Sequence, residues 1–464
     1  GADPGADPGG DQGADPGADS GGDQAGDAGG DLEPLFSVED TEDFDDPSIR
    51  TSLFFSPIDE LESRILDELA RVEESVYLAF FNIRLQEIAD SLLSLHQSGK
   101  EVKILMDQKQ MDKYYNTLDD WMIEQGLDVS GVLNDSAEDA TMHNKFTIID
   151  GRRVLTGSLN YSTTALNSSE EDVLLIDDAE IAVLYEEEFA ELASGGEAPR
   201  VEDPQAPLQV YFGPEDRLDL MTIAAIDSAQ TSIQVVMFSA GEASIEEALL
   251  DAIGRGGNVV FLIDQRQSED TDMDESIESA GAHVLRVDRS FPVELHDKLC
   301  VVDGTLVLAG SYNWTPLASF HNDENYLRIE SQALSARLLG RIVQIVRQEL
   351  DPFDPGDFGW AAGERSVTFT VTNLQVRSDA HCYVVGDLPQ MGSMDASQAL
   401  QMSRSDGPLG ESWWVEVDLP AGVEVEYRYL IRGPDEINHR EGAAPRSFTV
   451  PYLQQDYVLF DTFR

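Results

Sequence analysis

Between residues 54 and 190 the chain alternates continuous apolar runs with stretches in which apolar residues recur every three or four positions. The run at 75–81 (SVYLAFF) indicates a buried strand, the segment at 85–99 has helical spacing, and 101–108 is again strand-like. Strands that alternate with amphipathic helices are typical of α/β layer structures. The pattern therefore predicts an α/β fold for this part of the chain.

The same order of elements returns downstream at a nearly fixed spacing. Repetition of this kind is the signature of a duplicated structural unit. Five early positions match at an offset of 157 residues and eight later ones at 153: Phe55/Phe212, Pro57/Pro214, Ser75/Ser232, Asp107/Asp264 and Gln108/Gln265, then His143/His296, Lys145/Lys298, Asp150/Asp303, Gly151/Gly304, Gly157/Gly310, Ser158/Ser311, Asn160/Asn313 and Glu171/Glu324.

Beyond residue 364, short alternating runs such as SVTFTVT and SWWVEVDLPAG are separated by turn residues, which predicts a β-sandwich. Two stretches rich in Gly, Pro and acidic residues separate the repeats from each other and from the sandwich. We therefore predict a disordered acidic Gly/Ala/Asp/Pro leader at 1–50, a first α/β repeat at 51–194, a linker at 195–208, a second repeat at 209–350, a linker at 351–364 and a β-sandwich at 365–464.

Charge narrows the classes of partner. The formal net charge is -59, and the first 50 residues hold only 15 of the 89 acidic residues, so the folded part is itself strongly acidic. Such a surface repels polyanions and suits a saline habitat, with a cationic partner as the alternative. No apolar run is long enough to cross a membrane. The low-complexity leader favours a secreted, periplasmic or surface-attached protein.

One motif concentrates the scarce cationic residues. The chain has six lysines and seven histidines, and four of these thirteen lie in HNKFTIIDGRRVLTGSLN (143–160) and HDKLCVVDGTLVLAGSYN (296–313). Both copies follow the pattern His-x-Lys-x4-Asp-x6-Gly-Ser-x-Asn. Eight polar or glycine positions matched in duplicate point to a shared chemical role rather than to surface charge.

The residue types indicate phosphoryl transfer. Alternate positions of a strand face one side of a sheet, so His143 and Lys145, and likewise His296 and Lys298, share a face. If the copies face each other, two imidazoles and two ammonium groups surround a tetrahedral anion, one histidine attacking phosphorus and the other donating a proton. No metal or other cofactor is required. The expected phosphate donors are the amides of Asn160 and Asn313, with Ser158, Ser311, Gly157 and Gly310 in the phosphate-binding set.

The duplicated His-x-Lys-x4-Asp element resembles the signature of the phospholipase D superfamily, over about residues 53–350. The resemblance implies a duplicated phospholipase D-like α/β sandwich in which His143 is the nucleophile and His296 the general acid and base. It also implies that Glu171 and Glu324, each 28 residues after the histidine of its copy, hydrogen-bond an imidazole; Glu170 is a competing candidate. Asp150 and Asp303 complete the catalytic motif, although a role in the turn before the following glycine is favoured.

The superfamily contains phospholipases, phosphatidyl transferases and nucleases, and the motif does not separate them. Nucleic-acid binding relies on many Lys and Arg contacts to phosphates, and this chain is poor in both, so nucleic acid is the disfavoured substrate. We therefore expect a phospholipase D-type phosphoric diester hydrolase acting on phospholipid. A nuclease and a non-catalytic carbohydrate- or phosphate-binding surface protein stay as alternatives.

Residues 366–451 resemble a family-twenty starch-binding carbohydrate-binding module, which implies an immunoglobulin-like β-sandwich with two exposed tryptophans at its sugar site. This sequence has Met394 and His439 where those tryptophans are expected. Trp413 and Trp414 lie inside a strand, so one should be in the core and the other at the surface. Because stacking holds a sugar ring, a substrate-positioning or structural role is favoured over glycan binding through 365–464.

Overall fold

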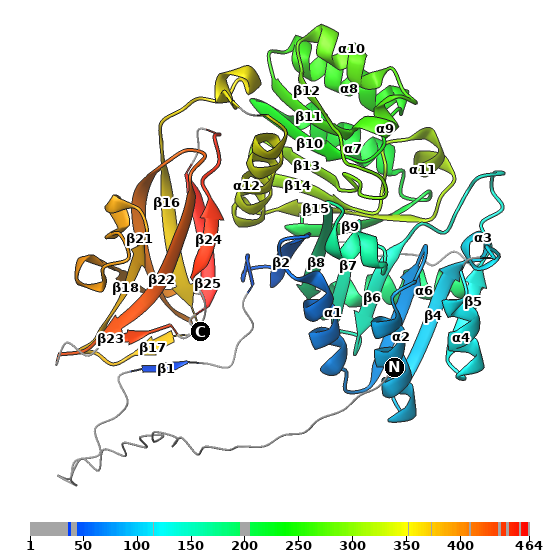
Figure 1. Cartoon of the computed structure of the whole chain (residues 1–464), viewed down its shortest axis with the longest axis horizontal. Helices are drawn as coiled ribbons and strands as arrows, with labels where there is room; N and C mark the ends of the chain where they lie inside the picture. The colour runs from blue at the N-terminus through cyan, green and yellow to red at the C-terminus, as the bar shows by residue number, and fades with distance from the viewer. Residues whose placement is uncertain are drawn as a thin grey trace, which may run out of the picture. The chain divides into compact units, whose positions relative to one another are not determined.

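The computed structural model describes residues 36–38, 44–114, 116–194, 205–350, 352–372, 374–407, 410–434, 438–441, 445–453 and 456–462. Within these residues the chain forms two seven-stranded mixed sheets with helices, followed by a two-sheet β-domain (Figure 1). The predicted α/β fold with a C-terminal β-sandwich is confirmed.

The first repeat is built around a sheet of order β2-β8-β7-β6-β3-β4-β5. Strands β3, β4 and β5 are parallel, and the other neighbours are antiparallel. Its elements are β2 (Thr51–Ser56), α1 (Leu61–Ala70), β3 (Ser75–Phe80), α2 (Gln86–Gln97), β4 (Glu101–Asp107), α3 (Gln108–Met111), α4 (Leu118–Glu124), β5 (Asp128–Val132), β6 (Lys145–Ile149), β7 (Arg153–Gly157), α5 (Thr163–Asn167), β8 (Glu171–Asp177) and α6 (Ala179–Ser194).

The second repeat has the equivalent sheet order, β9-β15-β14-β13-β10-β11-β12, which establishes the duplication in three dimensions. Its elements are β9 (Leu208–Gly213), α7 (Leu218–Ser228), β10 (Ser232–Met237), α8 (Ala243–Gly254), β11 (Asn258–Asp264), α9 (Gln265–Ser268), α10 (Met273–Ala280), β12 (His283–Val287), β13 (Lys298–Val302), β14 (Leu306–Gly310), α11 (Pro316–Phe320), β15 (Glu324–Glu330) and α12 (Gln332–Glu349).

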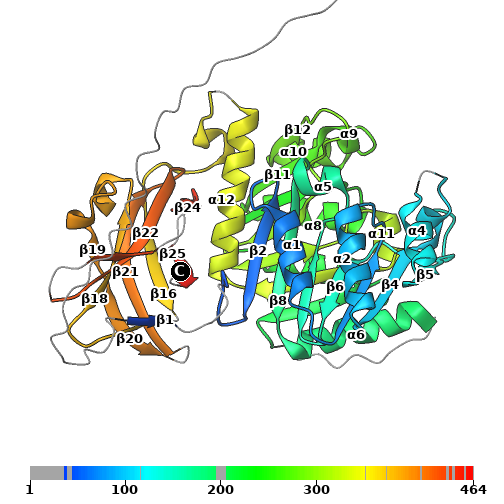
Figure 2. The same ribbon diagram turned by 60° about the horizontal axis from the view of Figure 1, so that its bottom comes forward.

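Each sheet is covered differently on its two faces. Helices α1 and α2 pack on one face of the first sheet, as Figure 2 shows, and α7, α8 and α10 pack on the corresponding face of the second. The other faces of both sheets share one core with α6 and α12. Burial of this continuous apolar surface holds the two repeats together and fixes the boundary at which the motif residues meet.

The C-terminal domain has sheets of order β20-β21-β16-β25 and β19-β18-β22-β23, with β24 paired to β22. Trp413 is buried (3% exposed) and its neighbour Trp414 is exposed (41%), as strand alternation predicts. The elements are β16 (Glu364–Thr372), β17 (Leu374–Val376), β18 (His381–Gly386), β19 (Leu400–Gln401), β20 (Ser403–Gly407), β21 (Gly410–Pro420), β22 (Glu424–Arg432), β23 (Asn438–Arg440), β24 (Arg446–Thr449) and β25 (Tyr457–Thr462), with 3-10 turns at Pro355–Phe358, Pro389–Met391 and Ala396–Gln398.

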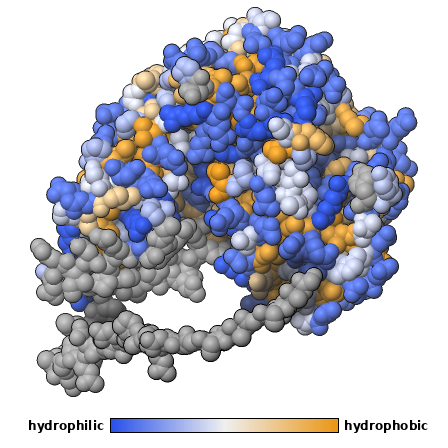
Figure 3. Space-filling model, viewed as in Figure 1, coloured by the Kyte–Doolittle hydropathy of each residue, from blue (hydrophilic) through white to orange (hydrophobic). Residues whose placement is uncertain are grey.

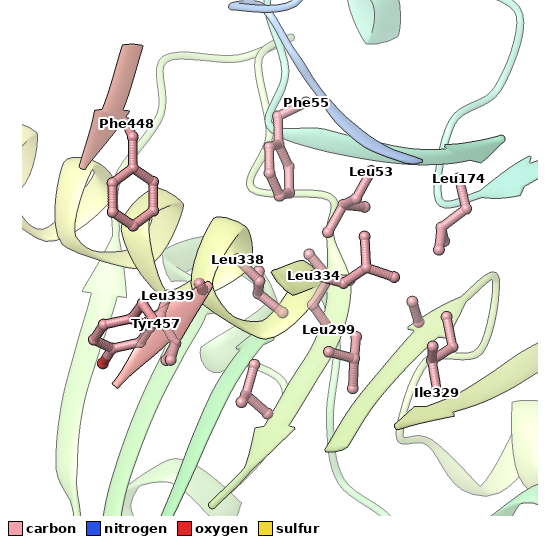
Figure 4. Packing of buried hydrophobic residues seen from close by; sticks show 14 of the residues in the cluster. Leu53, Phe55, Leu174, Leu299, Ile329, Leu334, Leu338, Leu339, Phe448 and Tyr457 are labelled. Atoms are coloured by element: carbon pink, nitrogen blue, oxygen red, sulfur yellow. The ribbon is translucent and has the colours of Figure 1, made fainter. Parts of the chain in front are cut away.

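Helix α12 packs against both the α/β core and the sandwich. Its residues Leu338 and Leu339 lie in one apolar cluster with Phe448 of β24 and Tyr457 of β25 (Figure 4). A Cβ at Gly340 would lie 2.9 Å from the backbone carbonyl oxygen of Thr449, so only glycine permits this close approach.

Part of the segment predicted as a disordered leader is ordered. Phe36–Val38 form β1, which pairs antiparallel with β17. The carboxylate of Asp45 accepts from the backbone N–H of Leu53 (2.8 Å), and that of Asp46 accepts from the Ser331 hydroxyl (2.6 Å). An acid-rich composition does not reveal which carboxylates serve as hydrogen-bond acceptors, so the prediction was wrong for 36–38 and 44–50. Residues 1–35 and 39–43 lie outside the described part.

The visible surface in Figure 3 is mostly hydrophilic, with separate hydrophobic areas. This agrees with the acidic composition of the folded part. Both cysteines, Cys300 and Cys382, are buried and unpaired. None of the helices in the described ranges is long and apolar enough to cross a membrane.

Candidate active site

Two short backbone ladders bring the motif histidines to the boundary between the repeats. In one, the N–H of His143 donates to the carbonyl of Asp323 (2.9 Å). In the other, the N–H of His296 donates to the carbonyl of Glu170 (2.8 Å), and the N–H of Glu170 donates to Glu294 (2.9 Å). The two ladders are equivalent at the repeat offset of 153 residues. Each histidine is therefore fixed by the backbone of the opposite repeat.

Each motif glutamate contacts the histidine of the other repeat. Nδ1 of His143 lies 2.8 Å from Oε2 of Glu324, and Nδ1 of His296 lies 2.8 Å from Oε2 of Glu171. The sequence correctly selected these glutamates as partners of imidazoles, but each partners the histidine of the other copy. The physical reason is the ladder geometry, which places the start of β8 beside His296 and the start of β15 beside His143. Neither half of the site is complete without the other repeat.

The motif serines hold these glutamates. The hydroxyl of Ser158 donates to Oε2 of Glu171 and that of Ser311 donates to Oε2 of Glu324, both at 2.6 Å. Each hydroxyl oxygen also accepts from the backbone N–H of the residue after that glutamate (2.9 and 3.0 Å). The sequence assigned these serines to phosphate binding. The structure instead gives their single hydroxyl proton to the carboxylate that orients the imidazole.

The motif glycines occupy positions without room for a side chain. Gly157 and Gly310 both have φ of 148°, and a Cβ there would lie 2.3 Å from the carbonyl oxygen of Asp172 or 2.4 Å from that of Asn325. This close approach of two strands, rather than contact with phosphate, accounts for glycine in both copies.

The two lysines are buried cations. Nζ of Lys145 donates to the backbone carbonyl of His143 (2.7 Å), and Nζ of Lys298 donates to that of His296. Each ammonium also lies over an aromatic ring, at 5.4 Å from the centroid of Phe81 for Lys145. Burial lowers the pKa of Lys145 to about 7 and also lowers the pKa of Lys298. A bound anion would therefore interact with poorly hydrated ammonium groups.

The motif asparagines have spare hydrogen-bonding capacity. Asn160 and Asn313 follow β7 and β14, and the amide oxygen of each is buried without a hydrogen-bond partner in the described structure. Both side chains are only partly buried. An unpaired amide oxygen can accept a hydrogen bond, and the donation of the amide N–H groups to a phosphate stays a prediction of the sequence.

The motif aspartates lie away from the histidines. The Asp150 carboxylate accepts from the backbone N–H groups of residues 73–75 at 2.8–2.9 Å, and Asp303 does the same for residues 230–232. Both have positive φ, 52° and 50°, immediately before a glycine. Backbone N–H groups lower the pKa of Asp150 and of Asp303 against the opposing effect of burial. Both aspartates stabilise the turn, which is the role that the sequence favoured. Their inclusion among the catalytic residues is therefore corrected.

Other residues of the site were not singled out by the sequence. The rings of Phe81 and Phe238 lie 5.1 and 4.6 Å from the imidazole centroids of His143 and His296. Asp107 and Asp264 accept from backbone N–H groups just before the histidines, those of Met142 (3.0 Å) and Leu295 (3.2 Å). The repeat match between Asp107 and Asp264 was the available signal for that positioning role.

The two histidine–glutamate contacts differ electrostatically. Burial tends to raise the pKa of Glu324, but the charge and hydrogen bond of His143 outweigh it and hold the pKa below its ordinary value. Burial raises the pKa of Glu171 well above its ordinary value. Burial also lowers the pKa of both histidines, and for His296 the charge of Lys298 depresses it further, well below the ordinary value. The shift of the Glu324 pKa thus favours its ionised form, whereas the shifts of the Glu171 and His296 pKa values favour their neutral forms.

The side chains of both histidines stay partly accessible, at 12% for His143 and 10% for His296. Two imidazoles, two buried ammonium groups and two amides therefore gather at one place. In the described parts of the chain, no three His, Cys, Asp or Glu side chains are arranged to hold a metal ion.

Comparison with known proteins agrees with this geometry. The sequence model of the family described as "Cardiolipin synthase, PLD-like domain" matches residues 65–193 and 222–346, and that of "Starch binding domain" matches 364–458. Relatives include a mitochondrial cardiolipin hydrolase of Xenopus tropicalis, 32% identical over 136 residues (28% of this chain, 60% of the relative), and a phospholipase D of Rickettsia bellii, 31% identical over 140 residues (29% and 65%). The chain thus spans less than two thirds of the length of these relatives.

A solved phosphatidylserine synthase from Haemophilus influenzae Rd KW20 has a TM-score of 0.53 at 14% identity, over 66% of this chain and 87% of that chain. At this identity the likeness concerns the fold alone. The two stretches that match the PLD-like model make up more than half of the chain and contain both histidine motifs. The chain therefore belongs to the family of cardiolipin synthase and phospholipase D-like domains, and it ends in a domain of the starch-binding type.

Proposed function

We propose that the chain is a metal-independent phosphodiesterase of the phospholipase D type, which hydrolyses a phospholipid phosphodiester or transfers its phosphatidyl group to an alcohol. The observation that carries the proposal is the pairing of two half-sites, each with a histidine–glutamate contact of 2.8 Å and a buried lysine. Two half-sites supply the two histidines that a double-displacement reaction requires.

In the first step, the lone pair of Nε2 of His143 attacks phosphorus and forms a P–N bond. The P–O bond to the alcohol breaks, its electron pair stays on oxygen, and His296 gives that oxygen a proton. In the second step, His296 takes a proton from water or an acceptor alcohol, whose oxygen displaces His143 from phosphorus. Glu324 supports the choice of nucleophile, because an ionised carboxylate at Nδ1 leaves the Nε2 lone pair free for attack.

Lys145 and Lys298 would neutralise the phosphate oxygens. The amide N–H groups of Asn160 and Asn313 would donate hydrogen bonds to them. Fixed charges in a site with little water stabilise the developing charge of a phosphoryl-transfer transition state more than solvated charges do. These four side chains supply the charge stabilisation for which many phosphodiesterases use a metal ion, so the proposed reaction uses no cofactor.

A phospholipid is the favoured substrate class. The relatives are named as a cardiolipin hydrolase and a phospholipase D, which supports a lipid phosphodiester here. The chain has 30 basic against 89 acidic residues, which disfavours a nucleic-acid backbone as substrate. A nuclease remains the second candidate, because the motif and the two half-sites suit any phosphodiester.

The C-terminal domain is proposed to position the substrate or to support the structure rather than to bind starch tightly. Met394, which stands where a sugar-binding tryptophan is expected, is partly buried and has φ of 60°. The side chain of His439 lies outside the described residues. Trp414 offers one exposed ring, but a single ring cannot hold a glucan as two platforms do. Retention of the full chain on insoluble starch, lost on Trp414→Ala, would contradict this proposal.

The substrate proposal is tested by giving the purified chain phosphatidylcholine with ethanol and, separately, plasmid DNA with a chelator. We expect phosphatidylethanol and phosphatidic acid, and intact plasmid. His143→Ala and His296→Ala should each abolish the lipid products. His96→Ala is the matched control, because His96 is exposed on α2 and should leave the rate unchanged. Nicked DNA would favour the nuclease, and wild-type rates in both histidine variants would refute the mechanism.

A further inference from the structure

One step along the ladders from the histidine–glutamate contacts, the two half-sites carry different buried groups. Behind His143, Nδ2 of Asn325 donates to Oδ1 of Asn144 (3.0 Å). At the offset of 153 residues, the counterparts of Asn144 and Asn325 are Asp297 and Asp172. The repeat symmetry therefore places two carboxyl groups together behind His296, where the other half has two amides.

The asparagine pair is well supplied with hydrogen bonds. Nδ2 of Asn144 donates to Glu188 (3.1 Å), and the hydroxyl of Thr156 donates to Oδ1 of Asn325 (2.8 Å). All of these groups are buried. The amide pair itself is neutral and satisfied, and the buried acid beside it, Glu188, accepts one of its hydrogen bonds.

The aspartate pair lacks the equivalent donors. The counterpart of Thr156 is Ala309, which has no hydroxyl, and the counterpart of Glu188 is Arg341. Arg341 is buried and forms its ion pair with Glu170. The second repeat thus lacks the hydroxyl and the carboxylate that serve the asparagine pair in the first.

Burial of the aspartates is nearly complete. Asp172 is 0% and Asp297 1% exposed, and both side-chain oxygens of Asp172 and Oδ1 of Asp297 have no hydrogen-bond partner within the described ranges. The Ser158 hydroxyl and the backbone N–H groups of Ser158 and Lys298 lie near Asp172, but none of them meets hydrogen-bond geometry, and the Ser158 hydroxyl donates to Glu171 instead. Two buried carboxyl groups without donors cannot both be ionised, so a proton between them is the arrangement of lowest free energy.

We propose that Asp172 and Asp297 share one proton and, as a singly charged pair, keep Glu171 protonated, so that Glu171 donates to Nδ1 of His296 and fixes the Nε2–H tautomer. This inference rests on the proposed phosphodiesterase function. It assigns the two aspartates as positioning residues that act through Glu171. The two histidines then hold opposite tautomers, because Glu324 is an ionised acceptor from Nδ1–H of His143.

The tautomers determine the direction of proton movement. As the P–O bond breaks, the Nε2 proton of His296 passes to the leaving oxygen and the Glu171 proton passes to Nδ1 of His296. The half-reaction leaves a neutral imidazole with a free Nε2 lone pair and an ionised Glu171. Water then gives its proton to Nε2, and Nδ1 returns its proton to Glu171. No charge accumulates on His296 in either step.

The pKa directions agree with this arrangement. Burial and then the charge of Asp172 raise the pKa of Asp297 well above its ordinary value, and burial raises the pKa of Asp172 to about 7. The charged or titratable groups that face the pair come from three strands: Glu171 on β8, Lys298 on β13 and Tyr326 on β15. The charge of Lys298 lowers the pKa values of both aspartates without reversing the shift.

The direct test is ¹⁵N NMR of histidine-labelled protein at pH 7, with His143→Asn and His296→Asn used for assignment. We expect His296 as the Nε2–H tautomer and His143 as the Nδ1–H tautomer. In the double variant Asp172→Asn/Asp297→Asn, which rebuilds the amide pair of the other half, His296 should change to Nδ1–H or become doubly protonated. The Nδ1–H form in the unchanged protein, or no change in the double variant, would overturn the proposal.

The kinetic test compares two leaving groups. For an alkyl phosphodiester, kcat of Asp172→Asn/Asp297→Asn at pH 8 should fall about 10²-fold, the lower range for a misplaced general acid. Loss of the nearby negative charge should also move the alkaline limb of the pH–rate profile to lower pH. The burst of 4-nitrophenolate from a nitrophenyl ester, which leaves without a proton, should keep its rate. Equal losses for both leaving groups, or an unmoved limb, would refute the role.

The single variants Asp172→Asn and Asp297→Asn guard against a folding failure of the double variant. Each removes one carboxyl and the shared proton, so the remaining aspartate alone carries the single negative charge of the pair. Both should therefore keep His296 as the Nε2–H tautomer and leave the alkaline limb nearly in place, and a change of tautomer in either variant would contradict the proposal. If the NMR tautomers are as expected while no diester is cleaved, the proposed function fails and the tautomer assignment stands.

Discussion

The two halves of the site share strand order, motif and backbone ladder, yet they differ in the polar groups buried behind the histidines. In the His143 half, the ionised Glu324 accepts from Ser311 (2.6 Å) and Asn322 (3.0 Å), and the next pair along the ladder is two amides. In the His296 half, Glu171 accepts from Ser158, and the next pair is two acids. Symmetric backbones thus carry unequal electrostatics.

The difference shows how a duplication can supply two catalytic roles. A double displacement requires one histidine with a free lone pair and one with a proton to give, although both occupy equivalent positions. Two imidazoles on identical supports would compete for the same protonation state. Unequal buried acids remove that competition, and the exchange of glutamates means that each repeat sets the state of the other's histidine.

The largest expected effects come from replacing the two histidines, and the two variants should respond differently to the leaving group of the substrate. His143→Ala should lose more than about 10⁴-fold in rate on both alkyl and nitrophenyl esters, because no phosphohistidine forms. His296→Ala should lose about 10²- to 10⁴-fold on the alkyl ester but keep the nitrophenolate burst, since only the proton donor is missing. Rapid-quench kinetics measure both steps. A burst retained by His143→Ala and lost by His296→Ala would reverse the roles.

Substitution of each glutamate by glutamine should give a similar but smaller difference between the two leaving groups. Glu324→Gln replaces an acceptor with an amide that can donate to Nδ1, so His143 loses its free Nε2 lone pair and both leaving groups should slow about 10²-fold. Glu171→Gln should slow the alkyl ester alone, because it removes the proton that replaces the one His296 gives away. Burst amplitudes in the same rapid-quench assay measure the difference. Equal losses on both esters in the two variants would contradict the claim that the two glutamates have different roles.

The lysines should make anion binding depend on pH. The pKa of Lys145 is about 7, so the ammonium is charged below that pH and neutral above it. Competitive inhibition by inorganic phosphate should therefore weaken as pH rises from 6 to 8, by up to about tenfold per pH unit for one required proton. The steady-state inhibition constant gives this readout. Lys145→Met should bind phosphate weakly at every pH, and an unchanged slope in that variant would assign the effect to another group.

The smallest effect on rate is expected outside the compared half-sites. Asp150→Asn keeps the positive φ that asparagine tolerates but weakens three hydrogen bonds to backbone N–H groups. The free energy of unfolding should fall by about 1 kcal/mol, with kcat nearly unchanged. Asp303→Asn is the matched control in the second repeat. Loss of activity without loss of stability in either variant would return these aspartates to the catalytic set.

The fold could be predicted from the sequence because apolar periodicity and the repeat offsets carry the element order. The motif also selected the histidines, lysines and glutamates that meet. It did not reveal that the glutamates are exchanged, because a spacing of 28 residues is the same in both copies whichever histidine each one faces. Nor did acid counts show that Asp45 and Asp46 bind backbone and hydroxyl donors.

The buried aspartate pair was also hidden from the sequence. Asp172 follows Glu171 and Asp297 follows His296, and in a strand successive side chains face opposite sides. Only the crossing of the two repeats brings these neighbours together. Their chemistry depends on the counterparts Ala309 and Arg341, whose effect is visible once the other half's donors, Thr156 and Glu188, are known.

The central claim is that His143 carries the phosphoryl group while His296 moves protons. The most direct measurement is mass spectrometry of His296→Ala protein quenched during reaction with a nitrophenyl phosphodiester. The account predicts one phosphohistidine, on the peptide that contains His143, at close to one per chain before turnover. Phosphate on His296 in the unchanged protein, or burst product formed by His296→Ala with no phosphohistidine on His143, would contradict it.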